Sequence, residues 1–227
     1  MAENKSQYLK QITSFYWENG YNPDMSQMER LAKFADLLTD KNEALNLISR
    51  KDMESLVENH IFLSSYIAKD IPEKCTRFLD IGTGGGFPGI PLAIMKPMMR
   101  GVLVDSIKKK TDAVAEFIDK LMLNNIKVEC SRVEDPEFIE KHKESFDLVV
   151  SRATVPLIIL LRYALPLVKE KAYLLAMKGG DLADEFAKAE LKYGPNIKKS
   201  TVFDLHYKPT NVKNIKGKKL ILIELVK

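Results

Sequence analysis

A run of glycines in the middle of the chain places the strongest constraint on its fold. Residues 78–89 read Phe-Leu-Asp-Ile-Gly-Thr-Gly-Gly-Gly-Phe-Pro-Gly, so an apolar stretch leads into four glycines within five residues. Glycine adopts positive φ without steric cost and lets the backbone approach a ligand closely. Pro88 falls where the first turn of a following helix is expected, a position that proline favours. The run predicts a buried strand, a tight ligand-binding turn and a helix, rather than a purely structural turn.

Upstream of this run, the apolar residues recur with the spacing of helices. We interpret residues 5–70 as three or four helices. Ser26, followed three residues later by Glu29, is a candidate N-cap for one of them. This part of the chain is predicted to form an N-terminal helical extension over residues 1–72.

From residue 73 onward, strand-like and helix-like segments alternate. We predict strands at 77–81, 101–105, 126–130, 146–151 and 172–177, with helices at 88–95, 108–123, 155–168 and 182–193. The last segments, 202–207 and 219–226, alternate with period two and predict an antiparallel hairpin. Five strands separated by helices favour a doubly wound, mostly parallel α/β sheet over residues 73–227. A closing hairpin is typical of the class I methyltransferase form of this Rossmann-like fold, rather than of its six-stranded dinucleotide-binding form.

Acidic residues near the glycine run distinguish between the ligands that such a turn can hold. Asp80 precedes the run, where a carboxylate suits the cationic amino group of S-adenosylmethionine and would repel a pyrophosphate. Asp105 ends the next strand, where a carboxylate accepts hydrogen bonds from the ribose of either cofactor. Val133 and Glu134 follow the third strand and are candidates for contact with an adenine. Asp80 therefore favours the sulfonium cofactor over a nicotinamide dinucleotide.

The charge balance is mildly basic, with 35 Lys and Arg against 31 Asp and Glu. The excess is concentrated near the C-terminus and in a second group after Asp105. These lysines are Lys198, Lys199, Lys208, Lys213, Lys216, Lys218, Lys219 and Lys227, and Lys108, Lys109 and Lys110. They form either an ordinary solvated surface or a face that contacts RNA phosphates around the mouth of the site.

Several classes of protein are disfavoured by composition. The N-terminus lacks the apolar core of a signal peptide, and no stretch approaches the roughly eighteen apolar residues that a membrane span needs. We therefore expect a cytoplasmic protein. Cys75 and Cys130 are expected to be free thiols, and no metal-ligand spacing occurs, so no metal is expected.

At the glycine run the sequence resembles the signature of the bacterial ribosomal RNA small-subunit methyltransferase G family, also called glucose-inhibited division protein B. The signature segment, 79–92, ends in Pro-Gly-Ile-Pro-Leu, which separates it from generic methyltransferase and nicotinamide loops. Weaker matches accompany it in order: Asn-Glu-Ala-Leu-Asn-Leu at 42–47, Val-Asp-Ser at 104–106, Val-Ser-Arg-Ala at 150–153 and Ala-Met-Lys-Gly-Gly at 176–180.

The resemblance implies methylation of N7 of one guanine in 16S ribosomal RNA, with S-adenosylmethionine as donor and with 16S RNA or the small ribosomal subunit as partner. The implied cofactor contacts are Gly82, Phe87, Val133, Glu134 and Arg152, supported by Asp80, Gly84 and Asp105. Arg152, at the end of the fourth strand, is also the candidate for positioning the substrate.

Three positions depart from the residues usual in that family, namely Lys41, Asn59 and Leu63. The last two flank His60, so a role of His60 in substrate binding is left open. Guanine N7 carries a lone pair and no proton, so its methylation needs no general base. This agrees with the sequence, in which none of the three histidines falls in a catalytic motif.

Two alternative functions are compatible with the fold. One is a non-catalytic RNA-binding or ribosome-assembly protein that retains the fold. The other is a nicotinamide-dependent oxidoreductase, which would require a second substrate domain that a chain of this length hardly provides.

Overall fold

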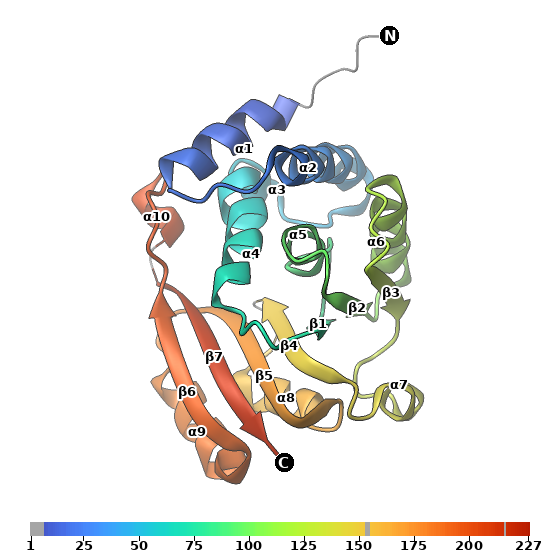
Figure 1. Cartoon of the computed structure of the whole chain (residues 1–227), viewed down its shortest axis with the longest axis vertical. Helices are drawn as coiled ribbons and strands as arrows, with labels where there is room; N and C mark the ends of the chain where they lie inside the picture. The colour runs from blue at the N-terminus through green and yellow to red at the C-terminus, as the bar shows by residue number, and fades with distance from the viewer. Residues whose placement is uncertain (1–6, 153–154, 216) are drawn as a thin grey trace.

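The computed structural model describes residues 7–152, 155–215 and 217–227 (Figure 1). Ala153, the last residue of the Val-Ser-Arg-Ala match, and Lys216 lie outside these described residues. The N-terminal part is helical, as predicted. Its elements are α1 (Gln7–Glu18), α2 (Met25–Leu45), α3 (Arg50–Met53), the π-helix η1 (Leu56–Phe62), α4 (Leu63–Tyr66) and the short 3-10 helix η2 (Ile67–Asp70).

The N-cap predicted for the second helix is wrong by two residues. Asp24, not Ser26, caps α2: its side chain accepts a hydrogen bond from the Gln27 backbone N–H, and the Gln27 side-chain oxygen accepts one from the Asp24 backbone N–H. Ser26 is the second residue of α2 and so cannot be its N-cap. Asp24 and Gln27 form the same kind of capping box that Ser26 and Glu29 could have formed two residues later. The sequence therefore contains two candidate N-caps close together, and the structure uses the first.

Seven strands form one sheet in the order β3-β2-β1-β4-β5-β7-β6. They are β1 (Arg77–Ile81), β2 (Arg100–Asp105), β3 (Ile126–Cys130), β4 (Phe146–Arg152), β5 (Val168–Gly179), β6 (Ile197–Asp204) and β7 (Lys218–Val226). The first five are parallel, and β7 runs antiparallel between β5 and β6. The predicted α/β class with a closing hairpin is confirmed, and this order differs from the 3-2-1-4-5-6 order of the dinucleotide-binding form.

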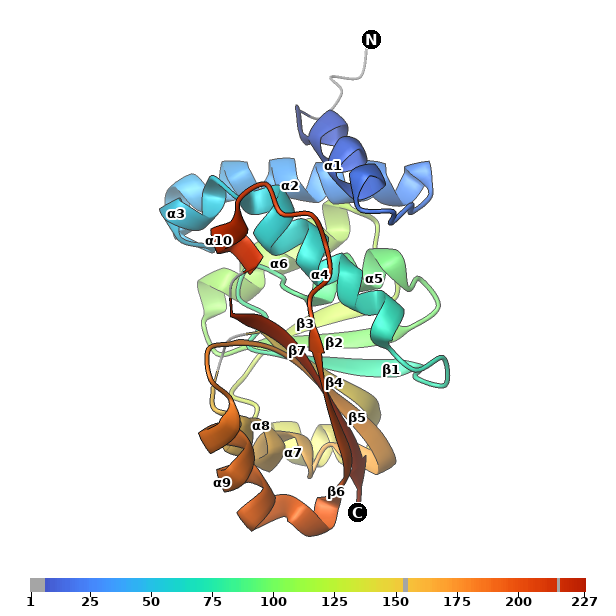
Figure 2. The same cartoon turned by 90° about the vertical axis from the view of Figure 1, so that its left-hand side faces the viewer.

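Helices cover the two faces of the sheet unequally (Figure 2). One face carries the N-terminal helices together with α5 (Gly89–Met95) and α6 (Lys108–Lys120). The other carries α7 (Pro136–His142), α8 (Leu157–Ala164) and α9 (Ala183–Tyr193). Chain crossings switch face between β1 and β4, so the carboxyl ends of these strands flank the crevice where such sheets bind ligands.

A large core joins the helical extension to the sheet. Phe34 of α2 packs against Phe87 at 5.1 Å and against Phe117 of α6 at 5.7 Å between ring centroids. The hydroxyl groups of Tyr16 and Ser65 lie 2.6 Å apart within the same core. The extension therefore forms part of the layer that holds α5 and the glycine run in place. The division at residue 72 stays a prediction.

The structure differs from the sequence prediction at two elements, α7 and β6. Helix α7 was not predicted, because its seven residues include only two apolar ones, Phe138 and Ile139. Strand β6 begins at Ile197, five residues before the predicted 202, because residues 197–201 pair with β7 despite two lysines and a serine. A short helix, α10 (Val212–Ile215), occupies the connection between β6 and β7.

Candidate functional site

The glycine run forms a turn that only glycine accommodates easily. Gly82, Gly84 and Gly86 have φ of 71°, 56° and 97°. The Gly82 backbone N–H donates to the carbonyl of Val104 at 2.9 Å, which fastens the turn to the end of β2. A Cβ on Gly86 would lie 2.6 Å from the terminal methyl of the buried Ile90 side chain, which would have to shift, in addition to the strain of the positive φ.

Asp105 ties the turn to the second strand. Its two carboxylate oxygens accept hydrogen bonds from the backbone N–H groups of Gly84, at 3.0 Å, and Ile107, at 2.9 Å. Each oxygen has a second lone pair, so the carboxylate keeps the capacity to accept from a ligand. Asp105 therefore both shapes the turn and presents an acceptor at its rim.

A pocket of about 200 Å³ opens beside the turn, at the carboxyl ends of the central strands. Four of the predicted cofactor residues line it: Gly82, Asp105, Val133 and Glu134. Ser131, Arg132, Val155 and Tyr163 were not among the predicted site residues but also line it, together with Ile81, Val104 and Ser106. Val155 lies between β4 and α8, and Tyr163 lies in α8, so the path of the chain after β4 brings both to the pocket.

Asp80 lies on the opposite side of the sheet from this pocket. Its side chain is completely buried, and one carboxylate oxygen accepts a hydrogen bond at 2.9 Å from the Gly89 N–H at the start of α5. The other oxygen, Oδ1, is buried without a hydrogen-bond partner among the described residues. Burial raises the pKa of this carboxyl to about 7, although the hydrogen bond from the Gly89 N–H lowers it.

Phe87 and Arg152 lie on the same side as Asp80. The Phe87 ring is buried under the turn, 5.1 Å from the His60 ring. Arg152 ends β4, and its guanidinium lies 3.4 Å from the hydroxyl of Ser64 in α4. Burial lowers the pKa of Arg152 to about 10, so the side chain stays charged near neutral pH in a poorly hydrated place. The sheet thus divides the predicted residues into two groups, one on each side of the turn.

A polar cluster surrounds Arg152 beneath the π-helix. Lys218 of β7 donates to the side-chain oxygen of Asn59 at 2.6 Å. His60 Nε2 lies 3.9 Å from a carboxylate oxygen of Asp52, and the His60 side chain is 10% exposed. Burial, reinforced by the charge of Arg152, lowers the pKa of His60 to about 3, so the imidazole is neutral at physiological pH. π-Helical turns occur frequently at functional sites.

Two of the positions that depart from the family pattern make long-range ion or hydrogen-bond contacts. Lys41 of α2 forms an ion pair with Glu116 of α6. Asn59 receives the Lys218 hydrogen bond described above, so a cation from β7 stands next to His60. Leu63 is buried in the core.

Lys178, in the Ala-Met-Lys-Gly-Gly match, supports the pocket wall from behind. Its ammonium donates to the carbonyl of Val155 at 2.7 Å and pairs with Glu185 of α9 at 2.7 Å. Glu185 in turn accepts from the Leu157 N–H at 3.0 Å. The Lys178 side chain is 9% exposed. These contacts hold Val155 and the first residue of α8 in place.

The C-terminal lysines do not all surround the mouth of the site. Lys213, Lys218 and Lys219 lie at the end of the sheet where Arg152 ends β4, but Lys198 and Lys227 lie at its far end, because β6 starts and β7 finishes there. The expectation of a single lysine face around the mouth is therefore only partly correct.

The described residues contain no candidate metal cluster, no membrane-spanning helix and no disulfide. No group of three or more His, Cys, Asp or Glu side chains there could hold a metal ion. No described helix is long and apolar enough to span a membrane. Cys75 is a buried free thiol and Cys130 an exposed one.

Comparisons with known proteins agree on one family. Residues 27–212 match the family model described as GidB, rRNA small subunit methyltransferase G. The Ribosomal RNA small subunit methyltransferase G of Desulfitobacterium hafniense is 38% identical over 79% of this chain and 75% of its own length. The protein of the same name from Bacteroides thetaiotaomicron is 40% identical over 73% of this chain and 82% of its own.

Solved structures share the fold at low sequence identity. A SAM-dependent methyltransferase from Aquifex aeolicus aligns over 83% of this chain and 97% of its own, with a TM-score of 0.55 and 17% identity. TYW2 of M. jannaschii, in complex with AdoMet, aligns over 74% of this chain and 75% of its own, with a TM-score of 0.53 and 16% identity. These similarities establish the class I methyltransferase fold.

Proposed function

Because the chain belongs to the rRNA small subunit methyltransferase G family, we propose that it transfers a methyl group from S-adenosylmethionine to N7 of a guanine in 16S ribosomal RNA. The observation that carries this proposal is the pocket between Gly82 and Val133, which opens beside a glycine turn at the carboxyl ends of the central strands. A ribosomal RNA substrate would place the reaction in the cytoplasm.

The residues present suit this cofactor. Apolar side chains of Ile81, Val133 and Val155 and the carboxylates of Asp105 and Glu134 line the pocket, a combination that fits an adenosine. Asp105 keeps acceptor capacity for the ribose hydroxyls. On the other side of the turn, the unpartnered oxygen of Asp80 matches an ammonium group.

We assign the residues roles on this basis. Gly82, Asp105, Val133 and Glu134 would hold the adenosine part. The amino-acid part would contact Asp80, Gly84, Phe87 and Arg152. Asp80 would bind its ammonium group, and Arg152 would bind its carboxylate group or the substrate. When bound, S-adenosylmethionine supplies an electrophilic methyl on a positively charged sulfur.

The chain's own contribution to the reaction would be positioning. Guanine N7 has a free lone pair, so no residue has to remove a proton before it attacks. The neutral His60, held between Phe87 and Arg152, could not act as an acid near pH 7 because its pKa is depressed to about 3. Alignment of nucleophile and methyl within a preformed site accounts for large rate effects without acid–base chemistry.

The target guanine would enter next to the polar cluster of Asn59, His60, Arg152 and Lys218. Arg152 and Lys218 are the two partly desolvated cations of this cluster. They could donate hydrogen bonds to a phosphate or to the electron-rich edge of a base. Since N7 lies on the Hoogsteen edge of guanine, the base would have to be unstacked or in a loop to reach the methyl.

The proposal is tested by incubating the protein with labelled S-adenosylmethionine and 16S RNA, or small subunits, from cells that lack the enzyme. Mass spectrometry should map one new methyl to a single guanine N7. Asp80→Asn should reduce incorporation strongly. Binding of S-adenosylhomocysteine with no methylation of either substrate would favour the non-catalytic RNA-binding alternative. Preferential binding of NAD would instead favour the oxidoreductase.

A further inference from the structure

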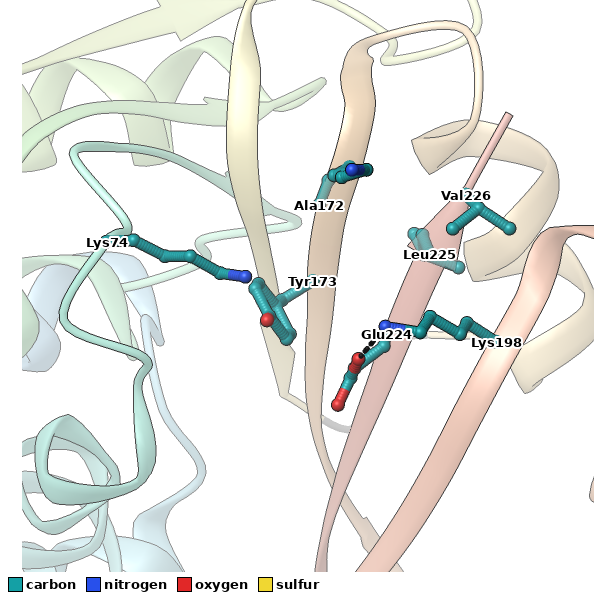
Figure 3. Close-up of a pocket in the computed structure, with 8 residues that line it drawn as sticks. Lys74, Ala172, Tyr173, Lys198, Glu224, Leu225 and Val226 are labelled. Carbon is teal, nitrogen blue, oxygen red and sulfur yellow. Dashed lines mark ion pairs between the residues drawn. The ribbon is translucent and has the colours of Figure 1, made fainter.

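A lysine-lined groove lies at the opposite end of the sheet from the cofactor pocket (Figure 3). It measures about 390 Å³ and sits where β5, β7 and β6 pass the loop that leads into β1. Its lining consists of Lys74, Lys171, Ala172, Tyr173, Lys198, Glu224, Leu225 and Val226. None of these residues takes part in the site proposed above.

The groove exists because helices leave this part of the sheet uncovered. Strand β7 places Lys218, Leu220, Leu222 and Glu224 on one face, since alternate residues of a strand share a face. Lys218 donates a hydrogen bond to Asn59 of the π-helix η1, and Leu220 is completely buried in the core. Glu224, about 20 Å further along the strand, is only half-buried in the groove.

The charge of the groove is predominantly positive. Lys74, Lys171 and Lys198 are exposed, and the one acidic side chain in the lining, Glu224, pairs with Lys198 at 3.5 Å. Lys74 approaches the ring of Tyr173, with its ammonium 5.1 Å from the centroid. Within the described part of the chain, Lys74 and Lys171 have no ion-pair partner closer than 4 Å, so two cations are not neutralised.

We propose that this groove is a second RNA-contacting surface, in which Lys74, Lys171 and Lys198 bind backbone phosphates of the substrate away from the methylated nucleotide. The inference rests on the proposed function for its choice of polyanion. The lysines come from three distant segments of the chain, namely the loop before β1, β5 and β6, yet all three line one groove. Contacts of this kind orient a nucleic acid without reading its sequence.

Phosphate contacts have a measurable signature. Each one adds roughly 0.7 to 0.9 to the slope of log affinity against log salt, because binding releases counterions. Losing three contacts should therefore lower that slope by about 2 and weaken binding roughly tenfold or more at 0.1 M salt. Catalysis at saturating RNA should be unaffected, because the groove lies far from Arg152 and the glycine turn.

The test compares two triple variants with the wild-type protein. Lys74→Gln, Lys171→Gln and Lys198→Gln together remove the groove charges. Lys143→Gln, Lys188→Gln and Lys192→Gln remove three exposed lysines on the α7–α9 side and match the change in net charge. Binding of a 16S RNA transcript is measured from 0.05 to 0.3 M KCl, with S-adenosylhomocysteine affinity as the check on folding.

Only the groove variant should show the flatter salt dependence, together with a raised KM for RNA and an unchanged kcat. Equal losses in both variants, or no loss in either, would overturn the inference. Normal binding of naked RNA combined with poor methylation of small subunits would assign the groove to a protein of the subunit and overturn it too. If the wild-type protein methylates no RNA, the proposed function fails, whereas the salt slopes still decide on the groove.

Discussion

In its proposed role, Asp80 would couple the protonation of its buried carboxyl to ligand binding. Its pKa of about 7 in the absence of ligand means that the group is mostly protonated at pH 6 and mostly ionised at pH 8. A ligand ammonium next to the carboxyl favours the ionised form, so binding at pH 6 requires loss of a proton.

We therefore expect S-adenosylhomocysteine to bind about tenfold more tightly at pH 8 than at pH 6, since the ionised fraction rises by that factor across a pKa near 7. Asp80→Asn keeps an oxygen for the Gly89 N–H but cannot ionise, so its weaker binding should not vary with pH. Isothermal titration calorimetry at the two pH values measures both. A wild-type affinity that is flat over this range would remove Asp80 from the ligand site.

Gly84 allows the cost of backbone strain to be separated from the loss of a ligand contact. Gly84 and Gly20 both have positive φ, of 56° and 65°, and neither would bring an added Cβ closer than 4.0 Å to the atoms around it. Alanine at either position should lower the free energy of unfolding by a similar amount, about 1–2 kcal/mol.

Only Gly84→Ala should also weaken S-adenosylhomocysteine binding, because only that turn faces the pocket. Urea denaturation and calorimetry on the two variants give the comparison. Equal affinity in both would mean that the turn has a structural role alone.

At the scale of secondary-structure elements, the carboxyl end of β5 supports the pocket through Lys178. Replacing Lys178 by Met removes its hydrogen bond to the Val155 carbonyl and leaves Glu185 without its cation. We expect a loss of stability of roughly 1–3 kcal/mol and a several-fold weaker affinity for S-adenosylhomocysteine. Lys188→Met, on the exposed side of α9, is the matched control and should change neither quantity.

The π-helix has a similar role for the connection between β6 and β7. Glu58, 3% exposed in η1, accepts hydrogen bonds from both the backbone N–H and the hydroxyl of Thr210. Tyr66 donates to the His206 carbonyl at 2.9 Å, which fastens the start of the same connection. Thr210→Val should speed amide hydrogen exchange in residues 207–215 without altering exchange in β1. Unchanged protection would show that other contacts hold this segment.

For the whole molecule, one core shared by the helical extension and the sheet predicts cooperative unfolding. Residues from α1, α2 and α4 pack in the same cluster as residues from α5, α6 and β1. We expect a single calorimetric transition with equal calorimetric and van't Hoff enthalpies. A fragment of residues 73–227 should fail to fold, because the face covered by α5 and α6 would lose the part of its cover that the N-terminal helices provide. Two separate transitions would instead mark residue 72 as a boundary between independent units.

Local sequence was sufficient for the features that depend on local physics. The predicted bounds of β1 and β3 agree with the structure to the residue, because a short run of strand-forming residues, continuous in β1 and alternating in β3, is easily read from the sequence. The glycine turn was predicted because positive φ at three alternate positions is accessible almost only to glycine. The fold class followed from the alternation of strand and helix, and the family from the Pro-Gly-Ile-Pro end of the signature.

Tertiary structure decided which side of the sheet each functional side chain faces. Asp80 lies one residue before the end of β1 and Asp105 ends the neighbouring β2, but Asp80 is buried under α5 and Asp105 borders the pocket. The contacts of Lys178 with Val155, of Lys218 with Asn59 and of Lys74 with Tyr173 join segments far apart in the chain. Such contacts depend on strand order and register, which arise from the packing of the whole core, so no local pattern contains them.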